Sequence, residues 1–478
     1  MNDFQVKGAT MKVFGVVLAA VLLSTNNSGG SVFLDDEPGG DYDAIAIDEA
    51  SPSVSDRESI DVSALLTAAR GAPPVICALA STSVRNMGWG DWSDAPVTPL
   101  GKDYALRDDD RDSRTLNQGD IPLLFNALAS DDACVREMGV RLLGRGRNPG
   151  IASGLIERLS SSSSSLREIA ALGLGLGEPK EAIDPLIRAL RDSEVGVRAN
   201  SAWALGHIEA GKALNPLMDL FRDNSVAVRE AAVVAVGRLD SVRTASTLIR
   251  VVRQDDSPAV RRAAAWALGQ LEAREAVEAL SAALSQDSDT RVREMAAWAL
   301  GEIESRSATA ALINAARRDS DDKVRELAVW ALGEIEDVSA IDALGQIAGS
   351  DKSARVRGTA AWALGQMDER GRAPAGLLSL LRDESADTRL KAAWALGQIG
   401  DSSALPAIRN ALKSETSETV NRALIRALLK SGERSEATLN ELLDSKDARV
   451  REAAVRGLAG RSSFNPWPWP WPRPRPTP

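Results

Sequence analysis

The chain has 478 residues, a formal net charge of −10, one histidine and two cysteines. The acidic balance argues against a nucleic-acid-binding or anionic-lipid-binding surface over the whole molecule, because such surfaces need an excess of Lys and Arg. One histidine and two cysteines exclude a multi-histidine metal centre and a four-cysteine zinc site. The sequence therefore predicts no metal site and no cofactor.

The N-terminal segment has the pattern of a secretion signal. Lys7 and Lys12 precede an apolar run at 14–23, FGVVLAAVLL, and small and polar residues follow up to Ser31. A run of this length suits the hydrophobic region of a signal peptide and is too short to span a bilayer. A buried core segment is the alternative. We expect residues 1–31 to direct export, which places the protein outside the cytoplasm, in a periplasm or secreted.

An acidic stretch and a cap region follow. Residues 32–61 are rich in Gly, Pro, Ser and carboxylates, a composition typical of a flexible linker. Residues 62–118 form a predicted N-terminal cap, with helical patterns at 62–70 and 74–80 and a turn-rich loop at 86–101. Trp89 and Trp92 in that loop either cover the first repeat or belong to a ligand loop.

The two cysteines, Cys77 and Cys134, lie in the cap and at its border with the rest of the chain. An even cysteine count in an exported protein indicates a disulfide. Two separate buried thiols are the alternative.

Residues 119–463 consist of about eleven copies of a unit of mostly 31–32 residues. The best-preserved copies read D-x5-R-x4-W-A-L-G-x-I/L/M, and their Val-Arg steps recur at a nearly constant interval. A fixed period of this length is the signature of a repeat architecture. The outer copies are degenerate, as expected for units that have a neighbour on one side only. The first positions of the steps are Val135, Leu166, Val197, Val228, Val260, Val292, Val324, Val356, Thr388, Val420 and Val450.

Each unit has the apolar spacing of two helices, A and B. In the third copy, helix A is predicted at 181–191, and Asp192 and Ser193 then break it and cap helix B, which runs to about residue 209. On a helical wheel Val197 and Leu205 face the core, whereas Trp203 points away from it. The Ala and Gly positions of helix B form a smooth flank, which lets the next B helix approach closely.

The D-x5-R pairs and the helix VR-x2-AAWALG-x-I resemble the HEAT repeat superfamily, in particular its short phycobilisome-lyase-type repeats, over about residues 119–462. The resemblance implies an all-α fold, a right-handed α-α superhelix with A helices on its convex side and B helices on its concave side. It implies no ligand, because function lies in sites rather than in folds.

Two enzyme families share this kind of repeat. The deoxyhypusine hydroxylase family needs repeated His-Glu pairs for two irons, whereas this chain has only His207, which is followed by Ile208. A lyase-like enzyme related to bilin lyases is a weaker alternative, because the resemblance is to the repeat alone and the chain is predicted to be exported. No nucleophile is positioned beside His207, which reads as a solvated surface residue. We therefore predict a protein that is not an enzyme and has no catalytic residues.

Six tryptophans share one position of helix B and are the candidate binding residues. Either each indole only staples its repeat to the adjacent one, or the row also exposes a binding face. The position four residues after the tryptophan carries a polar side chain in all six helices. In the first of them this residue is His207. Such a surface suits an extended peptide, could suit a glycan, and suits nucleic acid poorly. The predicted binding set is Trp203, Trp266, Trp298, Trp330, Trp362, Trp394, Gln270, Glu302, Glu334, Gln366 and Gln398.

Seven Asp/Arg pairs form a predicted structural ladder. The guanidinium can bond a carboxylate of its own or of the next repeat, and an Arg→Lys change would lose the two-pronged geometry. The pairs are Asp192/Arg198, Asp223/Arg229, Asp255/Arg261, Asp287/Arg293, Asp319/Arg325, Asp351/Arg357 and Asp383/Arg389.

The tail, residues 464–478, reads FNPWPWPWPRPRPTP. Proline at every second position excludes helix and strand and favours polyproline II. The segment resembles Trp/Pro-rich cationic host-defence peptides. It suits a membrane interface or an aromatic-lined groove, and a disordered end without a partner is the alternative. Because the chain itself has a tryptophan row, we hypothesise that residues 465–478 dock on that row of the same or a neighbouring molecule.

Together these features predict a non-catalytic scaffold of the cell envelope that binds a protein or peptide along a tryptophan-lined concave face. The alternative is a membrane-surface or glycan-binding protein that acts through its tryptophans and its tail, and membrane contact is expected through the tail only.

Overall fold

The computed structural model describes residues 61–73, 97–98, 101–102, 116–146, 148–239, 241–367, 371–433, 435–443, 451 and 455. The chain divides into two compact units, unit 1 up to Pro216 and unit 2 from Leu217 onward. The predicted signal peptide, almost all of the acidic linker, the loop tryptophans Trp89 and Trp92, and the tail lie outside the described residues.

Unit 1 contains helices and one small β-hairpin. Its elements are α2 (Val62–Ala69), β1 (Val97–Thr98), β2 (Gly101–Lys102), α4 (Asp120–Ala127), α5 (Ala133–Arg145), α6 (Pro149–Arg158), α7 (Ser164–Gly177), the 3-10 helix η1 (Lys180–Ala182), α8 (Ile183–Ala189), α9 (Val195–His207) and η2 (Gly211–Ala213). Helix α10 (Leu214–Asp219) contains the boundary between the units.

Unit 2 is helical throughout its described part. Its elements are η3 (Leu220–Arg222), α11 (Val226–Arg238), η4 (Val242–Thr244), α12 (Ala245–Gln254), α13 (Pro258–Gln270), η5 (Arg274–Ala276), α14 (Val277–Gln286), α15 (Thr290–Ile303), η6 (Arg306–Ala308), α16 (Thr309–Arg318), α17 (Asp322–Ile335), η7 (Val338–Ala340), α18 (Ile341–Ser350), α19 (Ala354–Gln366), α20 (Ala375–Ser379), η8 (Leu380–Arg382), α21 (Ala386–Ile399), η9 (Ser402–Ala404), α22 (Leu405–Ser414), α23 (Glu418–Lys430) and α24 (Glu436–Leu443).

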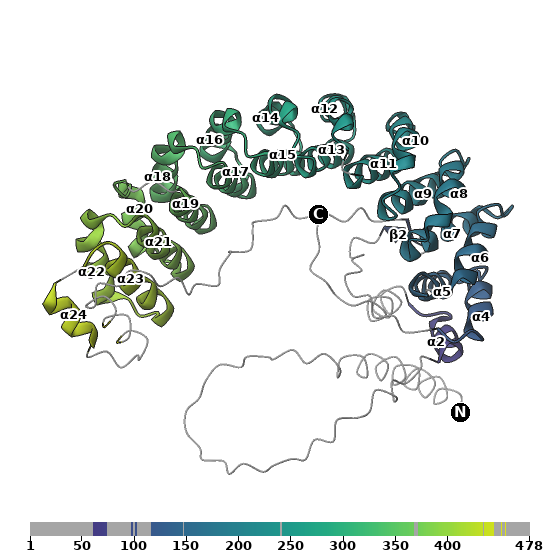
Figure 1. The fold of residues 1–478 in the computed structure, drawn as a ribbon, viewed down its shortest axis with the longest axis horizontal. Coiled ribbons are helices and arrows are strands. Elements are labelled where there is room, and N and C mark those ends of the chain that lie inside the picture. Colours follow the sequence, from purple (N-terminus) through teal and green to yellow (C-terminus); the bar gives the residue numbers. More distant parts are fainter. Residues whose placement is uncertain are drawn as a thin grey trace, which may run out of the picture. The chain divides into compact units, whose positions relative to one another are not determined.

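The helices of unit 2 form two rows. Each A helix packs on the B helix that follows it, and each B helix from α13 to α21 packs on the next B helix. In Figure 1, α12, α14, α16 and α18 lie along the outside of the bend of this unit, and α13, α15, α17 and α19 lie along its inside. The prediction of an all-α solenoid built from helix pairs is therefore confirmed, with the two-residue strands of unit 1 as a small addition.

The core lies between the two rows, where the wheel places it. In α17, Val324, Leu332 and Ile335 are buried, and Leu312 of α16 packs into the same layer with no exposed surface. The alanines of the B helices are buried as well. Their small side chains let adjacent B helices approach closely over their whole length.

The repeating Asp does not cap helix B, contrary to prediction. In the third repeat the N-cap residue is Glu194, two positions later, and the carboxylate of Asp192 instead accepts a hydrogen bond from the Glu194 N–H at 2.9 Å. The Asp thus closes a tight turn before the helix. In α15 and α17 the cap is a second carboxylate, Asp289 and Asp321, whose side chains accept from backbone N–H groups of the first turn.

Most described A helices begin with a 3-10 turn, so the helix predicted at 181–191 is η1 followed by α8, which ends at Ala189. The turn before the A helix is made by a residue that ends the preceding B helix and has the left-handed backbone conformation. This residue is a glutamate, not the usual glycine, in several repeats: the φ angles of Glu304 and Glu336 are both 50°. A left-handed conformation is uncommon for a residue with a side chain.

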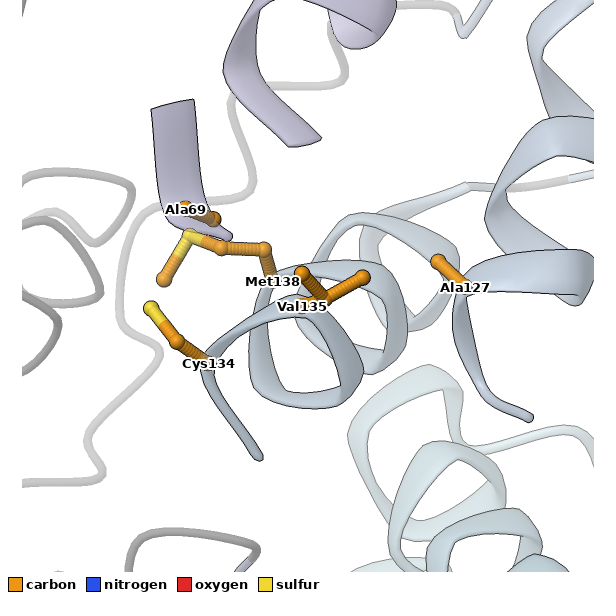
Figure 2. Packing of buried hydrophobic residues seen from close by; sticks show 5 residues of the cluster. All are labelled: Ala69, Ala127, Cys134, Val135 and Met138. Carbon is orange, nitrogen blue, oxygen red and sulfur yellow. The ribbon is translucent and has the colours of Figure 1, made fainter. Parts of the chain in front are cut away.

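The described part of unit 1 begins with α2, which lies within the residues 62–70 that were predicted to be helical. Figure 2 shows side chains of α2, α4 and α5 gathered into one apolar cluster, formed by Ala69, Ala127, Cys134, Val135 and Met138. Part of the predicted loop at 86–101 is the hairpin, in which Val97 pairs with Lys102. Strand β1 contacts the B helices α7 and α9.

Candidate binding surface

In seven of the described B helices, an arginine near the start of the helix bonds a carboxylate of the next repeat. In α17, Nε of Arg325 donates to Oδ2 of Asp351 at 2.8 Å, and Nη2 donates to Oδ1 at 3.1 Å. Of the two arrangements that the sequence left open, the structure shows the carboxylate of the next repeat. The same contact joins Arg167 to Asp192, Arg229 to Asp255, Arg261 to Asp287, Arg293 to Asp319, Arg357 to Asp383 and Arg389 to Glu415.

The guanidinium also binds the turn of its own repeat. Nη1 of Arg325 donates to the carbonyl oxygen of Asp319 at 3.0 Å, and the Asp319 carboxylate accepts from the N–H of Asp321 at 3.0 Å. In the remaining ladder positions, Arg198 donates in the same way to the carbonyl of Asp192, and Asp223 accepts from the N–H of Ser225. Arg325 and the six arginines that bond the next repeat therefore fix both the turn before their helix and the position of that repeat.

These contacts favour the ionised form of several ladder carboxyls. The hydrogen bonds from Arg167 and Arg389 hold the pKa values of Asp192 and Glu415 below their ordinary values. For Asp383, burial acts to raise the pKa, but the hydrogen bonds and charges of its neighbours, Arg357 first among them, outweigh burial and lower it. Carboxylates held in this way are structural, because they are already bonded on both oxygens.

Each described tryptophan of unit 2 lies against a glycine of the preceding repeat. A Cβ atom built on Gly301 would lie 2.5 Å from Cζ3 of Trp330, and one on Gly333 would lie 2.7 Å from Cζ3 of Trp362. No side chain fits in such a gap, so close approach explains the recurring glycine. The other pairs are Gly237 with Trp266, Gly269 with Trp298, Gly365 with Trp394 and, in unit 1, Gly175 with Trp203.

The tryptophans differ in exposure, and of the two arrangements that the sequence left open, three rings show stapling without an exposed face. Trp203, Trp266 and Trp330 are only 3%, 6% and 1% exposed. The wheel gave the direction of these side chains, but the glycine and alanine flanks bring the repeats so close that the rings are enclosed. The remaining three present part of their surface: Trp298, Trp362 and Trp394.

Polar side chains surround the partly exposed tryptophans. Of the residues four positions later, Gln270 and Gln398 are exposed, and Glu302, Glu334 and Gln366 are partly exposed. We call the side chains at the tryptophan position and one helical turn before and after it, on α15, α17, α19 and α21, the inner face. Its members are Glu294, Trp298, Glu302, Glu326, Trp330, Glu334, Gly358, Trp362, Gln366, Leu390, Trp394 and Gln398.

Two glutamates one turn before a tryptophan are desolvated. Burial raises the pKa of Glu294, and Lys323 opposes the shift. Burial also raises the pKa of Glu326, which lies 3.5 Å from Arg355. Oε2 of Glu294 is buried and has no hydrogen-bond partner among the described residues. The half of the inner face on α15 and α17 is thus rich in carboxylate oxygen, whereas the half on α19 and α21 carries amides.

In unit 1 the residue four positions after the tryptophan is His207, and its ring packs against the indole. The ring of His207 lies 4.2 Å from that of Trp203, measured between centroids, and is partly buried. The prediction of a solvated surface histidine is therefore wrong, because the indole one turn earlier covers it. Strand β1 also contacts α9. The candidate surface therefore lies in unit 2.

Cys134 is disulfide-bonded. The only other cysteine of the chain, Cys77, lies outside the described residues. Asp132 ties the same corner of unit 1 to α2, because its carboxylate accepts from the N–H of Gly71 at 2.7 Å.

Sequence reasoning missed two features of the surface. The left-handed glutamates Glu272, Glu304 and Glu336 are exposed and lie at the ends of the B helices, beside the inner face. Their signal was a Glu after the last apolar residue of successive repeats. The second feature is the desolvated pair Glu294 and Glu326, which could be found only by asking what stands one turn before each tryptophan.

In the part of the chain that the structure describes, no group of three or more His, Cys, Asp or Glu side chains could hold a metal ion. Within those same residues, every helix is too short or too polar to cross a membrane.

Three solved structures resemble this chain in fold. An engineered protein of the Northeast Structural Genomics Consortium is 21% identical, with a TM-score of 0.42, over 73% of this chain and 100% of that chain. The complex of CpcE and CpcF of phycocyanin lyase from a Nostoc species is 26% identical, with a TM-score of 0.32, over 47% and 90%. Kap95p bound to RanGDP is 17% identical, with a TM-score of 0.46, over 73% and 55%.

Comparison with curated proteins gives no match. The family model for HEAT repeats matches residues 152–237, 183–256, 245–319, 309–375 and 373–459. These matches overlap to cover well over half of the chain, and the helix pairs of the structure occupy the same residues. The resemblance drawn from the repeat pattern is thereby confirmed, and the chain belongs to the HEAT repeat family.

Proposed function

We propose that the protein is a non-catalytic scaffold that binds an extended protein segment along the inner face of unit 2. One observation carries the proposal: Trp298, Trp362 and Trp394 occupy the same position of their B helices, each is partly exposed, and each is followed one turn later by a polar side chain. Partly exposed tryptophans are frequent anchors at protein interfaces, because a large area is buried at small cost in side-chain entropy.

The spacing of the repeats favours an extended ligand. Helices that pack side by side lie about 10 Å apart. A polyproline II segment rises about 3 Å per residue with three residues per turn, so it advances about 9 Å per turn. Every third residue of such a segment therefore meets the next B helix. A helical ligand advances about 5 Å per turn, so it would meet successive B helices only at every second turn.

The ladder supports a scaffold in another way. Because Arg325 and its counterparts hold successive repeats by two hydrogen bonds each, the inner face is fixed before a ligand arrives. A preorganised surface binds with a smaller loss of entropy.

A panning experiment tests the proposal. Random display peptides are selected on the full chain, and the photoreactive residue benzoylphenylalanine replaces either Gln366, at the end of helix B α19, or Gln346, an exposed glutamine of helix A α18 in the same repeat. Selected peptides should crosslink through position 366 and not through position 346. Equal crosslinking at both positions, or no enriched peptide, would count against a binding face on the B helices.

We also propose that the protein acts outside the cytoplasm. The apolar run at 14–23 and the disulfide at Cys134 support this location, because disulfides persist in oxidising compartments. Intact-mass measurement of protein recovered from the envelope or medium should show loss of about 31 N-terminal residues. A full-length chain found only in the cytoplasm would contradict export.

A further inference from the structure

The charged side chains of the inner face of unit 2 are distributed unevenly along the row of repeats. On α15 and α17 a glutamate stands one turn before and one turn after the tryptophan, in the order Glu-x3-Trp-x3-Glu. On α19 and α21 the residue after the tryptophan is a glutamine, Gln366 or Gln398, and no carboxylate precedes it. The face therefore offers anionic oxygen towards α15, and aromatic and amide surface towards α21.

We propose that the occupant of this face is the chain's own tail, residues 464–478, which runs back along the B helices from α21 towards α15. This assignment rests on the function proposed above and adds the identity of the ligand. In the docked arrangement, the segment around Trp467 lies over the aromatic and amide half of the inner face. The guanidinium of Arg473 then reaches the carboxylates of the acidic half.

The tail is long enough to do this. Val455 is the last described residue, and it belongs to the eleventh repeat, two repeats after α21 and five after α15. With about 10 Å per repeat, α21 lies about 20 Å away and α15 about 50 Å away along the row. Val455 is helical and the HEAT repeat matches extend to residue 459, so extended geometry is counted only from that residue onward. In polyproline II geometry Trp467 then reaches about 25 Å, Trp471 about 37 Å, Arg473 about 43 Å and Arg475 about 50 Å. The tryptophans can therefore reach α21 and α19, and the arginines can reach α17 and α15.

The three-residue period of the tail also matches the spacing of the B helices. In polyproline II every third residue lies on one side, so Trp467, Pro470 and Arg473 share a side. Placed one per repeat, these residues meet α21, α19 and α17 in turn. Proline packs well on an exposed indole such as Trp362, as in aromatic grooves that bind proline-rich segments. Arginine pairs with carboxylates such as that of Glu334.

The desolvated glutamates give a second reason for a cationic ligand. Glu294 is 5% exposed, and its Oε2 lacks a hydrogen-bond partner among the described residues. Burial raises its pKa, which means that its ionised form is poorly solvated there. A guanidinium beside α15 would stabilise the ionised carboxylate through its charge, without contact to the enclosed Oε2.

Competition measured by fluorescence anisotropy tests the assignment. A labelled peptide of residues 464–478 is titrated into the native full chain and into a full chain whose tail carries W467A, W469A, W471A, R473A and R475A. A tethered tail acts at an effective concentration of about 1 mM, so the native chain should bind the free peptide about tenfold more weakly. Equal binding to the two chains would overturn the assignment.

Charge reversal provides the matched control. In the tail-substituted chain, Glu302→Lys with Glu334→Lys should weaken peptide binding about tenfold or more, whereas Glu278→Lys with Asp342→Lys, on the A helices α14 and α18, should not. If tail peptide binding is absent or insensitive to the inner-face pair while display-selected peptides still crosslink at position 366, the tail is not the ligand and the scaffold function stands. If neither peptide binds, both proposals fail.

Crosslinking tests the direction. Benzoylphenylalanine in place of Asn465 in the full chain should react with α21 or α23. In place of Thr477 it should react with α15 or α17. In both cases the crosslinked product should have the mass of a single chain. The reverse pattern, reaction with the A helices, or a band at twice the chain mass would contradict the docking of the tail on its own inner face.

Discussion

Glycine and tryptophan act as one structural pair at the residue scale. The glycine of one B helix removes a side chain at the point where the indole edge of the next B helix lies, as at Gly365 and Trp394. Glycine lowers helix propensity by about 1 kcal/mol relative to alanine. Its recurrence in the middle of a helix is therefore explained by the space that the indole needs.

Two glycines of α19 make this testable. A Cβ atom at Gly365 would lie 2.4 Å from Cζ3 of Trp394 and 2.9 Å from the backbone Cα of Ala395, whereas one at Gly358 would lie 3.2 Å from the flexible end of Lys391. Gly365→Ala should destabilise unit 2 by about 1–3 kcal/mol. Gly358→Ala should be neutral or stabilise it by up to about 1 kcal/mol. Urea unfolding of both variants checks this, and equal effects would contradict the pairing.

At the scale of the element, the arginine ladder fixes how one helix pair stands on the next. Each guanidinium joins three pieces of chain: its own helix, the turn before it and the turn of the following repeat. For Arg357 the partners are the carbonyl of Asp351 and both oxygens of Asp383. Because successive repeats touch only their neighbours, such contacts set the coupling between units.

The ladder predicts a dependence of stability on pH. The pKa of Asp383 is lowered in the folded chain, so its contribution is present above the ordinary value of about 4 and is lost as the pH falls through the lower folded value. We expect the melting temperature of the native chain to fall between about pH 5 and pH 2. Asp383→Asn should melt lower at neutral pH and lose less on acidification.

The control for that experiment is Asp342→Asn, which removes one negative charge from an exposed position of α18. Its acid profile should follow that of the native chain. If Asp383→Asn also followed the native profile, the ladder carboxyl would not be a source of the acid sensitivity.

The sequence predicted the helix pairs and the recurring arginines of the ladder because both depend on spacing alone. The period placed Arg325 near the carboxylate of its own or the next repeat, and only the structure selected Asp351. The exposure of Trp330 could not be predicted in this way, since a wheel gives an angle and not the distance to the neighbouring helix. The left-handed glutamates were missed because propensity favours glycine there.

At the scale of the whole molecule, the disulfide at Cys134 lies at the capped end of unit 1. Its reduction should destabilise this end by about 4 kcal/mol if the long loop to Cys77 is the one it closes. Hydrogen exchange should then accelerate in α2 and α5 and stay unchanged in α15 to α19. A free thiol in the oxidised native protein, or faster exchange spread evenly over both units, would contradict this prediction.

The two contacts that join neighbouring repeats point in opposite directions along the chain. The arginine of a repeat reaches forward, as Arg325 does to Asp351, and its tryptophan reaches back, as Trp330 does to Gly301. A copy that holds both residues thus carries one half of each joint, and its two ends are interchangeable with those of the other such copies. Duplication or loss of one whole period would leave all joints intact, so such a gene can change the number of its copies without redesigning a single interface.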